Sequence, residues 1–394
     1  MNRTGTHLPY NPHVLGWARK RTGLALEDVA GKIRVSAQKV ADRETGKAQP
    51  TIRQGRLLAK ICGRHFLELF SETVPELRKI DLAPDYRMSK TRNAQGPKER
   101  RALEAVHEWA EEQRLNALAL LQDLEEIPPV FPENLRFDAA ADVEEAARAC
   151  RTAMRLPFQD QRSFKKSKRY KFPDILRDHI ERLGGLVLKH SALTGLGARG
   201  ICLFAHPLPV IVFGNESPGA QAFTLAHELG HILLRESGIS GPPFGEKKGH
   251  TAIEDWCNRF AAAFLAPKDA IRQTLPKPDT PAAHFDTGEL KRLSEMFFIS
   301  PHAMLIRLVS LGYVQPRFYW KEMRPVLLKN EETYKPFGRP PYYGRRYVNA
   351  KGRYYTGLVM SAWCAGQITA HNAAEYMGIR NLKHLRDIRE DYGF

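Results

Sequence analysis

The stretch FTLAHELGHILL (residues 223–234) places two histidines, His227 and His231, four residues apart in an otherwise apolar run. In an α-helix, residues i and i+4 lie on one face, so both imidazoles can reach one tetrahedral zinc ion. Glu228 lies beside this face, where it could accept a proton from an attacking water. Gly230 in mid-helix costs about 1 kcal/mol relative to alanine. We therefore expect a closely packed neighbour next to it, such as a strand.

A catalytic zinc site needs a third protein ligand and one open position. The next predicted helix, residues 252–265, carries Glu254 in its first turn, and this residue would complete a His-His-Glu set. The alanines of the same helix would allow it to approach the HExxH helix closely. Four other residues compete for the third position: Asp255, Cys257, His250 and His206.

Short apolar runs before the HExxH segment predict a small three-stranded sheet. They are rich in Val, Ile and Leu and are bounded by Gly or Pro, which is typical of strands. The three runs lie at residues 185–193, 199–206 and 209–215. Apolar spacing of three and four residues predicts helices elsewhere. These helices are expected at about 98–124, 140–154, 174–183, 219–236, 287–297 and 301–311. Pro218 and Ser300 are expected helix-start signals, and Thr369 and Gly378 are expected to cap a helix of the C-terminal appendage. The expected fold class is therefore α+β, mainly α.

The paired motifs resemble the ImmA/IrrE family of zinc-dependent peptidases. That family has HELGH followed by E-x-x-A-N-x-F-A-A-x-L-L-x-P, and this chain has HELGH followed by EDWCNRFAAAFLAP from Glu254. The resemblance covers roughly residues 160–312. Cys257 stands where the family has alanine, a change that does not threaten the metal site.

The resemblance implies a zincin-like domain, in which the HExxH helix packs beside the small sheet. It implies that His227, His231 and Glu254 are the zinc ligands and that Glu228 is the catalytic base. The expected cofactor is therefore Zn²⁺.

Residues 26–44 have the form of a helix-turn-helix module. Ser36 is a good N-cap for its second helix. The side chains expected to be exposed and to contact a DNA major groove include Ser36 at the start of that helix and Gln38, Lys39 and Arg43 within it. Glutamine can read adenine edges, whereas lysine and arginine read guanine or phosphate. The alternative interpretation is a helical module for dimerisation or partner docking that does not recognise DNA.

The same module resembles the XRE (lambda repressor-like) family, in which E-x-G followed by P-T is typical. Here these motifs are Glu44-Thr45-Gly46 and Pro50-Thr51. The chain departs from the family at Arg34, where a turn glycine is usual, and at Arg43, where a buried tryptophan is usual. We expect the lambda repressor-like fold to survive both changes.

Composition and charge narrow the classes of partner. The chain has 60 Lys and Arg against 44 Asp and Glu, a net charge of +16, which favours polyanionic partners and nucleic acid first. No run approaches the roughly 18 apolar residues of a membrane helix, and MNRTGTHLPYNPH has no apolar secretory segment. Five widely spaced cysteines argue against a disulfide framework and fit a reducing cytoplasm. We therefore expect a cytoplasmic protein with no membrane partner.

These signals divide the chain into four predicted parts. They are an XRE-like domain (8–72), a helical linker region (73–160), an ImmA/IrrE-like zinc peptidase domain (161–312), and a basic and aromatic loop with a helical C-terminal appendage (313–394).

The order of the modules resembles a class of bacterial and phage regulators that are often encoded beside toxin-like partners. The predicted function is a DNA-binding transcriptional regulator whose zinc metallopeptidase domain hydrolyses a partner protein. The expected partners are operator DNA and a protein substrate or toxin-like protein, and a homodimer is compatible with this class. The alternative is an antitoxin or repressor whose zinc domain binds a partner or signal without proteolysis.

Overall fold

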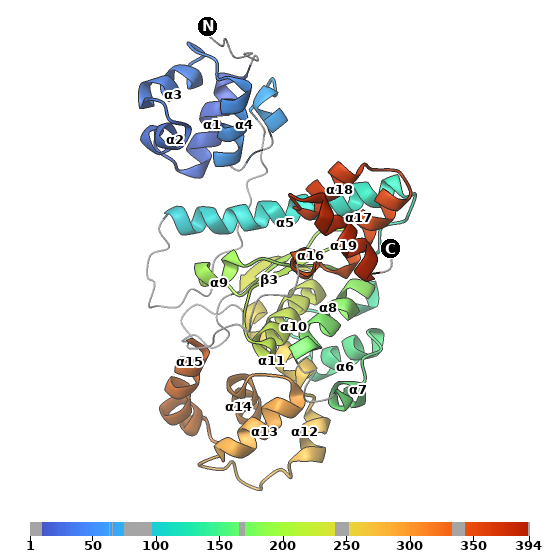
Figure 1. The fold of residues 1–394 in the computed structure, drawn as a ribbon. Coiled ribbons are helices and arrows are strands. Elements are labelled where there is room, and N and C mark those ends of the chain that lie inside the picture. Colours follow the sequence, from blue (N-terminus) through green and yellow to red (C-terminus); the bar gives the residue numbers. More distant parts are fainter. Residues whose placement is uncertain are drawn as a thin grey trace. The chain divides into compact units, whose positions relative to one another are not determined.

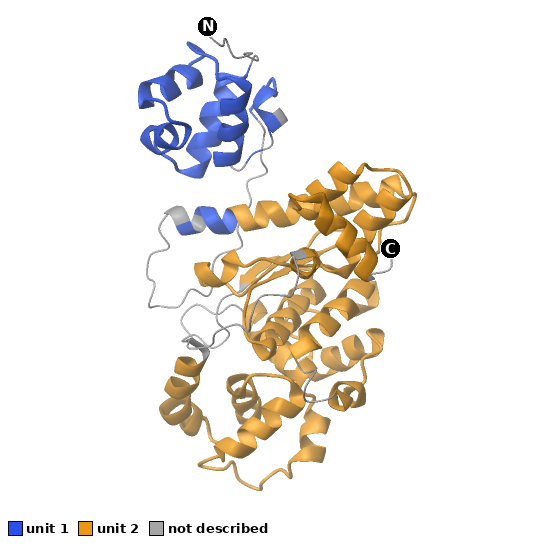
Figure 2. Ribbon diagram, viewed as in Figure 1, with its two compact units in different colours: residues 1–81, 94–104 blue, residues 82–93, 105–394 orange. Residues whose placement is uncertain are grey.

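The structure, a computed structural model, has two compact units. It describes residues 10–62, 64, 66–74, 97–164, 170–240, 252–332 and 343–392. The first unit comprises residues 1–81 and 94–104, and the second comprises residues 82–93 and 105–394 (Figure 2). Helices dominate both units, and one small sheet lies in the second, which confirms the expected α+β, mainly α class (Figure 1).

Unit 1 is a small helical bundle around an apolar core. Its elements are α1 (Pro12–Thr22), α2 (Leu26–Ile33), α3 (Ala37–Glu44), α4 (Ile52–Ile61) and a 3₁₀ helix, η1 (Phe66–Phe70). The largest fully buried aliphatic side chains of this core are Val14, Leu15, Val29, Val40, Leu58 and Leu69. The predicted helical character of this region is confirmed.

The turn between α2 and α3 has the geometry that the sequence predicted. Ser36 caps α3, because its side chain accepts a hydrogen bond from the backbone N–H of Lys39 at 3.3 Å. Arg34 ends α2 with φ 56°, in the left-handed region where glycine is the usual residue. The arginine costs about 1–2 kcal/mol of backbone strain at this position, and the fold of unit 1 tolerates it.

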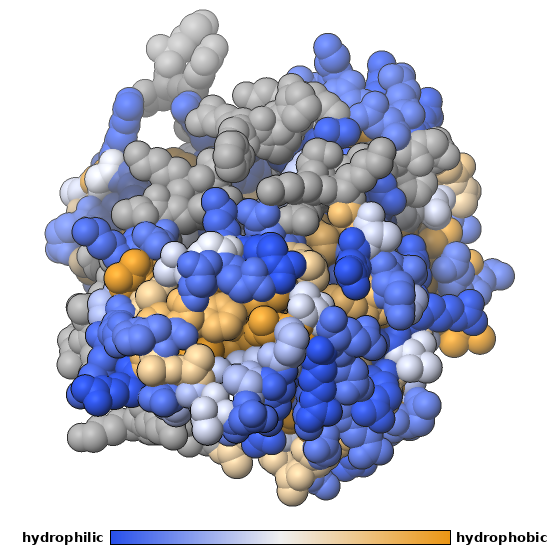
Figure 3. Space-filling view, turned by 90° about the horizontal axis from the view of Figure 1, so that it is seen from below, coloured by the Kyte–Doolittle hydropathy of each residue, from blue (hydrophilic) through white to orange (hydrophobic). Residues whose placement is uncertain are grey.

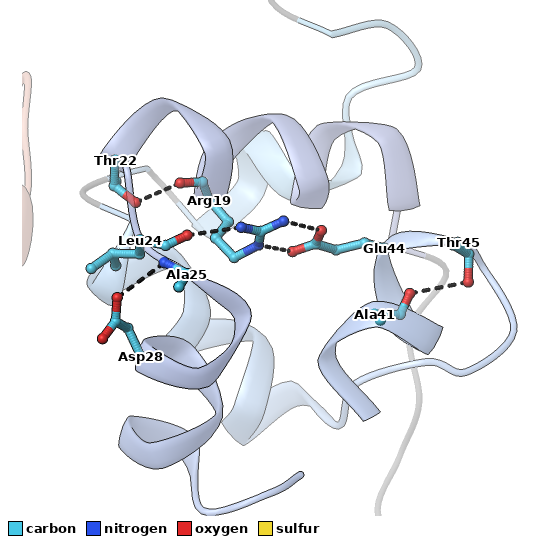
Figure 4. A network of polar contacts seen from close by, with 8 residues as sticks. All are labelled: Arg19, Thr22, Leu24, Ala25, Asp28, Ala41, Glu44 and Thr45. Carbon is cyan, nitrogen blue, oxygen red and sulfur yellow. Dashed lines mark hydrogen bonds and ion pairs between the residues drawn. The ribbon is translucent and has the colours of Figure 1, made fainter. Parts of the chain in front are cut away.

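An ion pair between α1 and α3 fixes the packing of unit 1 (Figure 4). The Arg19 guanidinium donates from Nε to Oε1 of Glu44 at 2.6 Å and from Nη2 to Oε2 at 2.8 Å. Its Nη1 donates to the carbonyl of Leu24 at 2.8 Å, so one side chain joins α1, α3 and the loop before α2. Glu44 of the E-x-G motif is therefore a structural residue of this fold.

Unit 2 contains a sheet of four strands, and the prediction of three was wrong. The strands are β1 (Leu186–Lys189), β2 (Gly200–Leu203), β3 (Val210–Phe213) and β4 (Gly238–Ser240), in the order β1-β3-β2-β4. Strands β1 and β3 are parallel, and β2 is antiparallel to both β3 and β4. β4 has only three residues, so it carries no alternation by which a sequence pattern could reveal it.

The HExxH helix, α10 (Pro218–Leu234), packs on this sheet. Ser217 caps its N-terminus and Pro218 occupies its first turn, as expected of a helix start. Every residue from Ala222 to Leu234 is buried, so α10 is a central helix covered on all sides. Helix α8 (Phe172–Arg182) packs beside α10 and against β1.

Helix α11 (Ala252–Leu265) packs along α10 at Gly230. A Cβ atom on Gly230 would lie 3.2 Å from Cys257 Sγ and 3.2 Å from Phe260 Cδ1. The expectation of close packing at Gly230 is therefore confirmed, but the neighbour is a helix and not a strand. The residues of α11 at this contact are Cys257 and Phe260, not the alanines of the helix.

The other helices of unit 2 surround this centre. Before the sheet lie α5 (Pro97–Asp123, which begins in unit 1), a 3₁₀ turn η3 (Glu133–Leu135), α6 (Val143–Ala153) and α7 (Phe158–Ser163), and between β1 and β2 lies α9 (Ala192–Leu196). After α11 come α12 (Lys268–Thr274), α13 (Thr287–Phe297), α14 (Pro301–Ser310), a π-helical segment η5 (Phe318–Met323) and α15 (Arg324–Glu332). Ser300 caps α14, as predicted.

Four C-terminal helices complete unit 2: α16 (Tyr343–Lys351), α17 (Arg353–Cys364), α18 (Ala370–Met377) and α19 (Leu382–Tyr392). The sequence predicted a loop where α16 lies, and this was wrong. Helix α16 packs against β1 and α19, and these contacts outweigh the weak helix propensity of its Tyr- and Gly-containing sequence. The predicted N-cap Thr369 and C-cap Gly378 of α18 are confirmed.

A buried ion pair on α8 holds the junction of α16 and α17. Arg177 Nε lies 3.4 Å from Glu181 Oε1, and Arg177 Nη1 donates to the carbonyl of Asn349 at 2.7 Å. Glu181 accepts from the backbone N–H of Tyr354 at 3.2 Å. The C-terminal helices are thus anchored to the helix that supports the sheet.

Within the described residues, no helix combines the length and apolar character needed to cross a membrane.

Figure 3 shows one face of the molecule, where hydrophilic side chains surround a strip of apolar ones.

Candidate metal centre

Three buried side chains on two adjacent helices meet at one point. His227 and His231 come from α10 and Glu254 comes from the first turn of α11. One ligand atom from each residue lies within 4.8 Å of the other two. His227 Nε2 is 3.4 Å from Glu254 Oε2, and His231 Nε2 is 3.1 Å from Glu254 Oε1.

This arrangement fits a tetrahedral metal ion. Two ligand atoms that each lie about 2.1 Å from a tetrahedral zinc ion are about 3.4 Å apart. The two nitrogen–oxygen distances are close to that separation. Two imidazoles and one carboxylate are also the donor set of catalytic zinc sites with three protein ligands.

The charge state of Glu254 suits a metal ligand. Burial by itself raises the pKa of this carboxyl, but its hydrogen bonds to His227 and His231 outweigh that effect. The net result is a pKa well below the usual range, so the carboxylate is ionised at neutral pH. An ionised carboxylate is the form that binds a cation.

Two glycines of the sheet make room for the side chains of α10. A Cβ atom on Gly200 of β2 would lie 2.3 Å from Glu228 Oε1, so the Glu228 carboxylate lies directly against this strand. A Cβ atom on Gly238 of β4 would lie 2.7 Å from His231 Cε1. The sequence analysis missed both residues. A glycine inside a strand signals a close approach, but nothing in the sequence shows what approaches it.

The competitors for the third ligand are not part of this cluster. The Asp255 side chain is exposed and lies 3.8 Å from Arg259, and His206 is exposed. Cys257 contacts His231, but its thiol is not among the ligand atoms that converge at this point. His250 lies outside the described residues.

Three of the four residues predicted to contact DNA lie at the start of α3 in unit 1. Ser36, Gln38 and Lys39 are exposed, as that interpretation requires. Gln38 Nε2 donates to Asp42 Oδ1 at 2.9 Å within the helix, so its amide is already oriented along the exposed face.

Arg43 does not lie on that face, and the prediction that it is exposed was wrong. Only 7% of the residue is accessible, and its Nη2 donates to Gln54 Oε1 at 2.8 Å. Arg43 therefore faces the interior of unit 1. Its aliphatic stem can pack there while Gln54 binds the head group.

A comparison with protein families agrees with this geometry. The model of the Peptidase_M78 family, described as the IrrE N-terminal-like domain, matches residues 194–309. The matched segment contains both histidines and Glu254. Fold and site together therefore define a metallopeptidase-like domain within the second unit. A search of curated proteins found no match to the chain.

Proposed function

We propose that the chain is a DNA-binding regulator whose second unit is a zinc-dependent peptidase acting on a partner protein. The observation that supports the peptidase most directly is the convergence of His227, His231 and Glu254, with Glu228 adjacent on the same helix. The family match over residues 194–309 supports the same proposal.

The proposed reaction is hydrolysis of a peptide bond. Two imidazoles and one carboxylate would hold zinc, which supplies Lewis acidity to polarise the carbonyl and acidify water. Glu228 accepts the proton of the attacking water and passes it to the leaving amine. Its carboxylate lies against Gly200 of β2, where the missing side chain leaves room for it.

The proposal that unit 1 binds DNA rests on the helix-turn-helix geometry of α2 and α3. The exposed Gln38 and Lys39 lie two and three positions after the capping Ser36, at the N-terminal end of the helix that would enter a major groove. The net charge of +16 supports a polyanionic partner. Arg43 is not part of this proposal, because its side chain is buried.

One observation favours the second candidate, a repressor or antitoxin whose metal domain binds a partner without cleaving it. Glu228 is 0% accessible and the three proposed ligands are 1–3% accessible, a degree of burial that is also typical of structural metal sites. A buried metal site stabilises a fold or an interface without any catalysis.

The experiment that separates the two candidates uses the product of the neighbouring gene. The zinc-loaded full chain is incubated with that protein, and the masses of both are followed over time. The peptidase proposal predicts fragments of the partner with the parent chain and none with Glu228→Gln. A stable complex with intact partner for both proteins would favour the second candidate.

Self-cleavage is the competing outcome of the same experiment. The basic segment around 161–172 is a candidate site, and residues 165–169 of it lie outside the described part of the chain. A Glu228-dependent fragment that ends near residues 160–172 and forms without any partner would show that the substrate is the chain itself and not a separate protein.

A further inference from the structure

A cavity of about 590 Å³ lies in unit 2 beside helices α6, α7, α11 and α12. None of the proposed metal ligands lines it. Its charged lining residues are Arg148, Arg151, Arg155, Lys268, Glu144 and Asp269. Glu144 lies 2.6 Å from the guanidinium of Arg307, so its charge is compensated from outside the lining. The cavity is therefore electropositive.

Arg151 is the buried cation of this cavity. The residue is 7% accessible, and its Nη1 donates to Gln161 Oε1 at 2.9 Å and to the Phe264 carbonyl at 2.8 Å. Its Nη2 has no hydrogen-bond partner among the described residues, and no carboxylate there forms an ion pair with it. A buried guanidinium normally has an anionic partner, because burial without one is costly.

The guanidinium of Arg151 is held in a fixed orientation. It lies over the rings of Phe264 and Phe158, at 5.2 and 5.8 Å from their centroids. Its bond to the Phe264 carbonyl caps the C-terminal end of α11, and Gln161 caps the next carbonyl, that of Leu265, at 3.0 Å. A donor held rigidly in this way loses little conformational freedom when it binds a ligand.

We propose that this cavity binds a small organic anion, with Arg148, Arg155 and Lys268 as the cations that contact it and Arg151 as a buried positive charge of the lining. The volume lies within the range of about 300–1,000 Å³ that is typical of small-molecule sites. Phe158 and Leu156 add apolar surface that suits an organic body. The ligand's head group is a carboxylate or a phosphate, because a guanidinium pairs with both.

Isothermal titration of the full chain with phenyl phosphate, benzoate and the neutral benzyl alcohol tests the proposal. We expect saturable binding of one phenyl phosphate or one benzoate per chain and none of the alcohol. Tighter binding of one anion identifies the head group as phosphate or carboxylate. Titrations of protein treated with a chelator should give the same affinity, because the cavity does not include the metal ligands.

Variants then locate the site. Arg155→Gln with Lys268→Gln should weaken binding by about tenfold or more, since each removes a cation of the lining. Arg136→Gln with Lys291→Gln removes the same charge from exposed positions outside the cavity and should leave the affinity unchanged. Arg151→Lys keeps the positive charge but replaces the planar guanidinium, with its several N–H donors, by a single ammonium group. This variant should also weaken binding.

If Arg151→Lys does not fold, the variant with Arg155→Gln and Lys268→Gln still tests whether the anion binds in this cavity. The proposal is overturned if neither anion binds saturably, if the two double variants bind equally well, or if chelation abolishes binding.

Discussion

His231 Nε2 lies 3.1 Å from Oε1 of Glu254, across the contact between α10 and α11. Glu254 follows His231 by 23 positions in the sequence, and the separation is that of two ligands on one tetrahedral ion. Gly230 permits the helices to approach closely enough for this, since its Cβ position is already in tight contact with Cys257 and Phe260.

Two alanine substitutions should separate metal binding from catalysis. Gly200→Ala places a methyl group where Glu228 Oε1 lies, so the carboxylate must move. We expect zinc content to be retained and cleavage of the partner to fall by about tenfold or more. Zinc analysis and the cleavage assay on the same preparation measure both.

Gly238→Ala is the matched substitution on the neighbouring strand. Its methyl group would meet the His231 ring, which is rigid and cannot turn aside as a glutamate can. We expect the zinc affinity to fall by about tenfold or more, the size of effect seen when a ligand loses its orientation. Equal zinc affinities for the two variants would show that the strands do not position these side chains.

DNA binding by unit 1 should depend on salt and on two exposed residues of α3. Lys39→Ala should weaken binding to all sequences and reduce the salt slope by about one, because one phosphate contact is lost. Gln38→Ala should relax the sequence preference with less loss of overall affinity. Binding to the promoter of its own gene, measured at several salt concentrations, tests both.

Lys60→Ala, which removes an exposed lysine at the end of α4, is the control for Lys39→Ala. If both lysine variants lost affinity equally, α3 would not be the reading helix.

The stability of unit 2 should depend on pH through Glu181. Burial raises the pKa of this carboxyl to about 7, against the lowering effect of Arg177. Because the folded pKa lies above the unfolded value, this stabilising contribution is present below about pH 4.5 and is lost as the pH rises through about 7. The loss between pH 5 and pH 8 corresponds to about 2 kcal/mol.

Urea unfolding at pH 5 and pH 8 measures this contribution. Glu181→Gln should show a smaller decrease in the free energy of unfolding than the parent, whereas Glu390→Gln, at an exposed position, should behave like the parent. An unchanged pH dependence in Glu181→Gln would assign the effect to other groups.

The sequence predicted the elements that carry strong local signals. Helices α10, α11 and α14 were found because apolar periodicity and N-terminal signals such as Pro218 and Ser300 agree there. The family resemblance favoured Glu254 over its competitors. The structure supplies a physical reason, because among the described candidates Glu254 is the one whose carboxylate lies near both histidines.

The errors arose where distant contacts decide the outcome. Strand β4 exists because β2 offers it a pairing edge, and helix α16 because β1 and α19 pack against it. The local sequence around Arg43 is that of an exposed helix position. Its side chain is nevertheless buried, where it donates a hydrogen bond to Gln54, eleven positions later. The cavity at Arg151 combines residues from four helices, and no local motif marks it.

The most direct test of the central claim is the zinc content of the purified chain and its variants, measured by elemental analysis after extensive dialysis. The account predicts about one zinc per chain in the parent and in Glu228→Gln, and loss of zinc in His231→Ala and Glu254→Ala. Zinc bound equally by all four proteins, or absent from the parent after growth with added zinc, would contradict the assignment of His227, His231 and Glu254 as a metal centre.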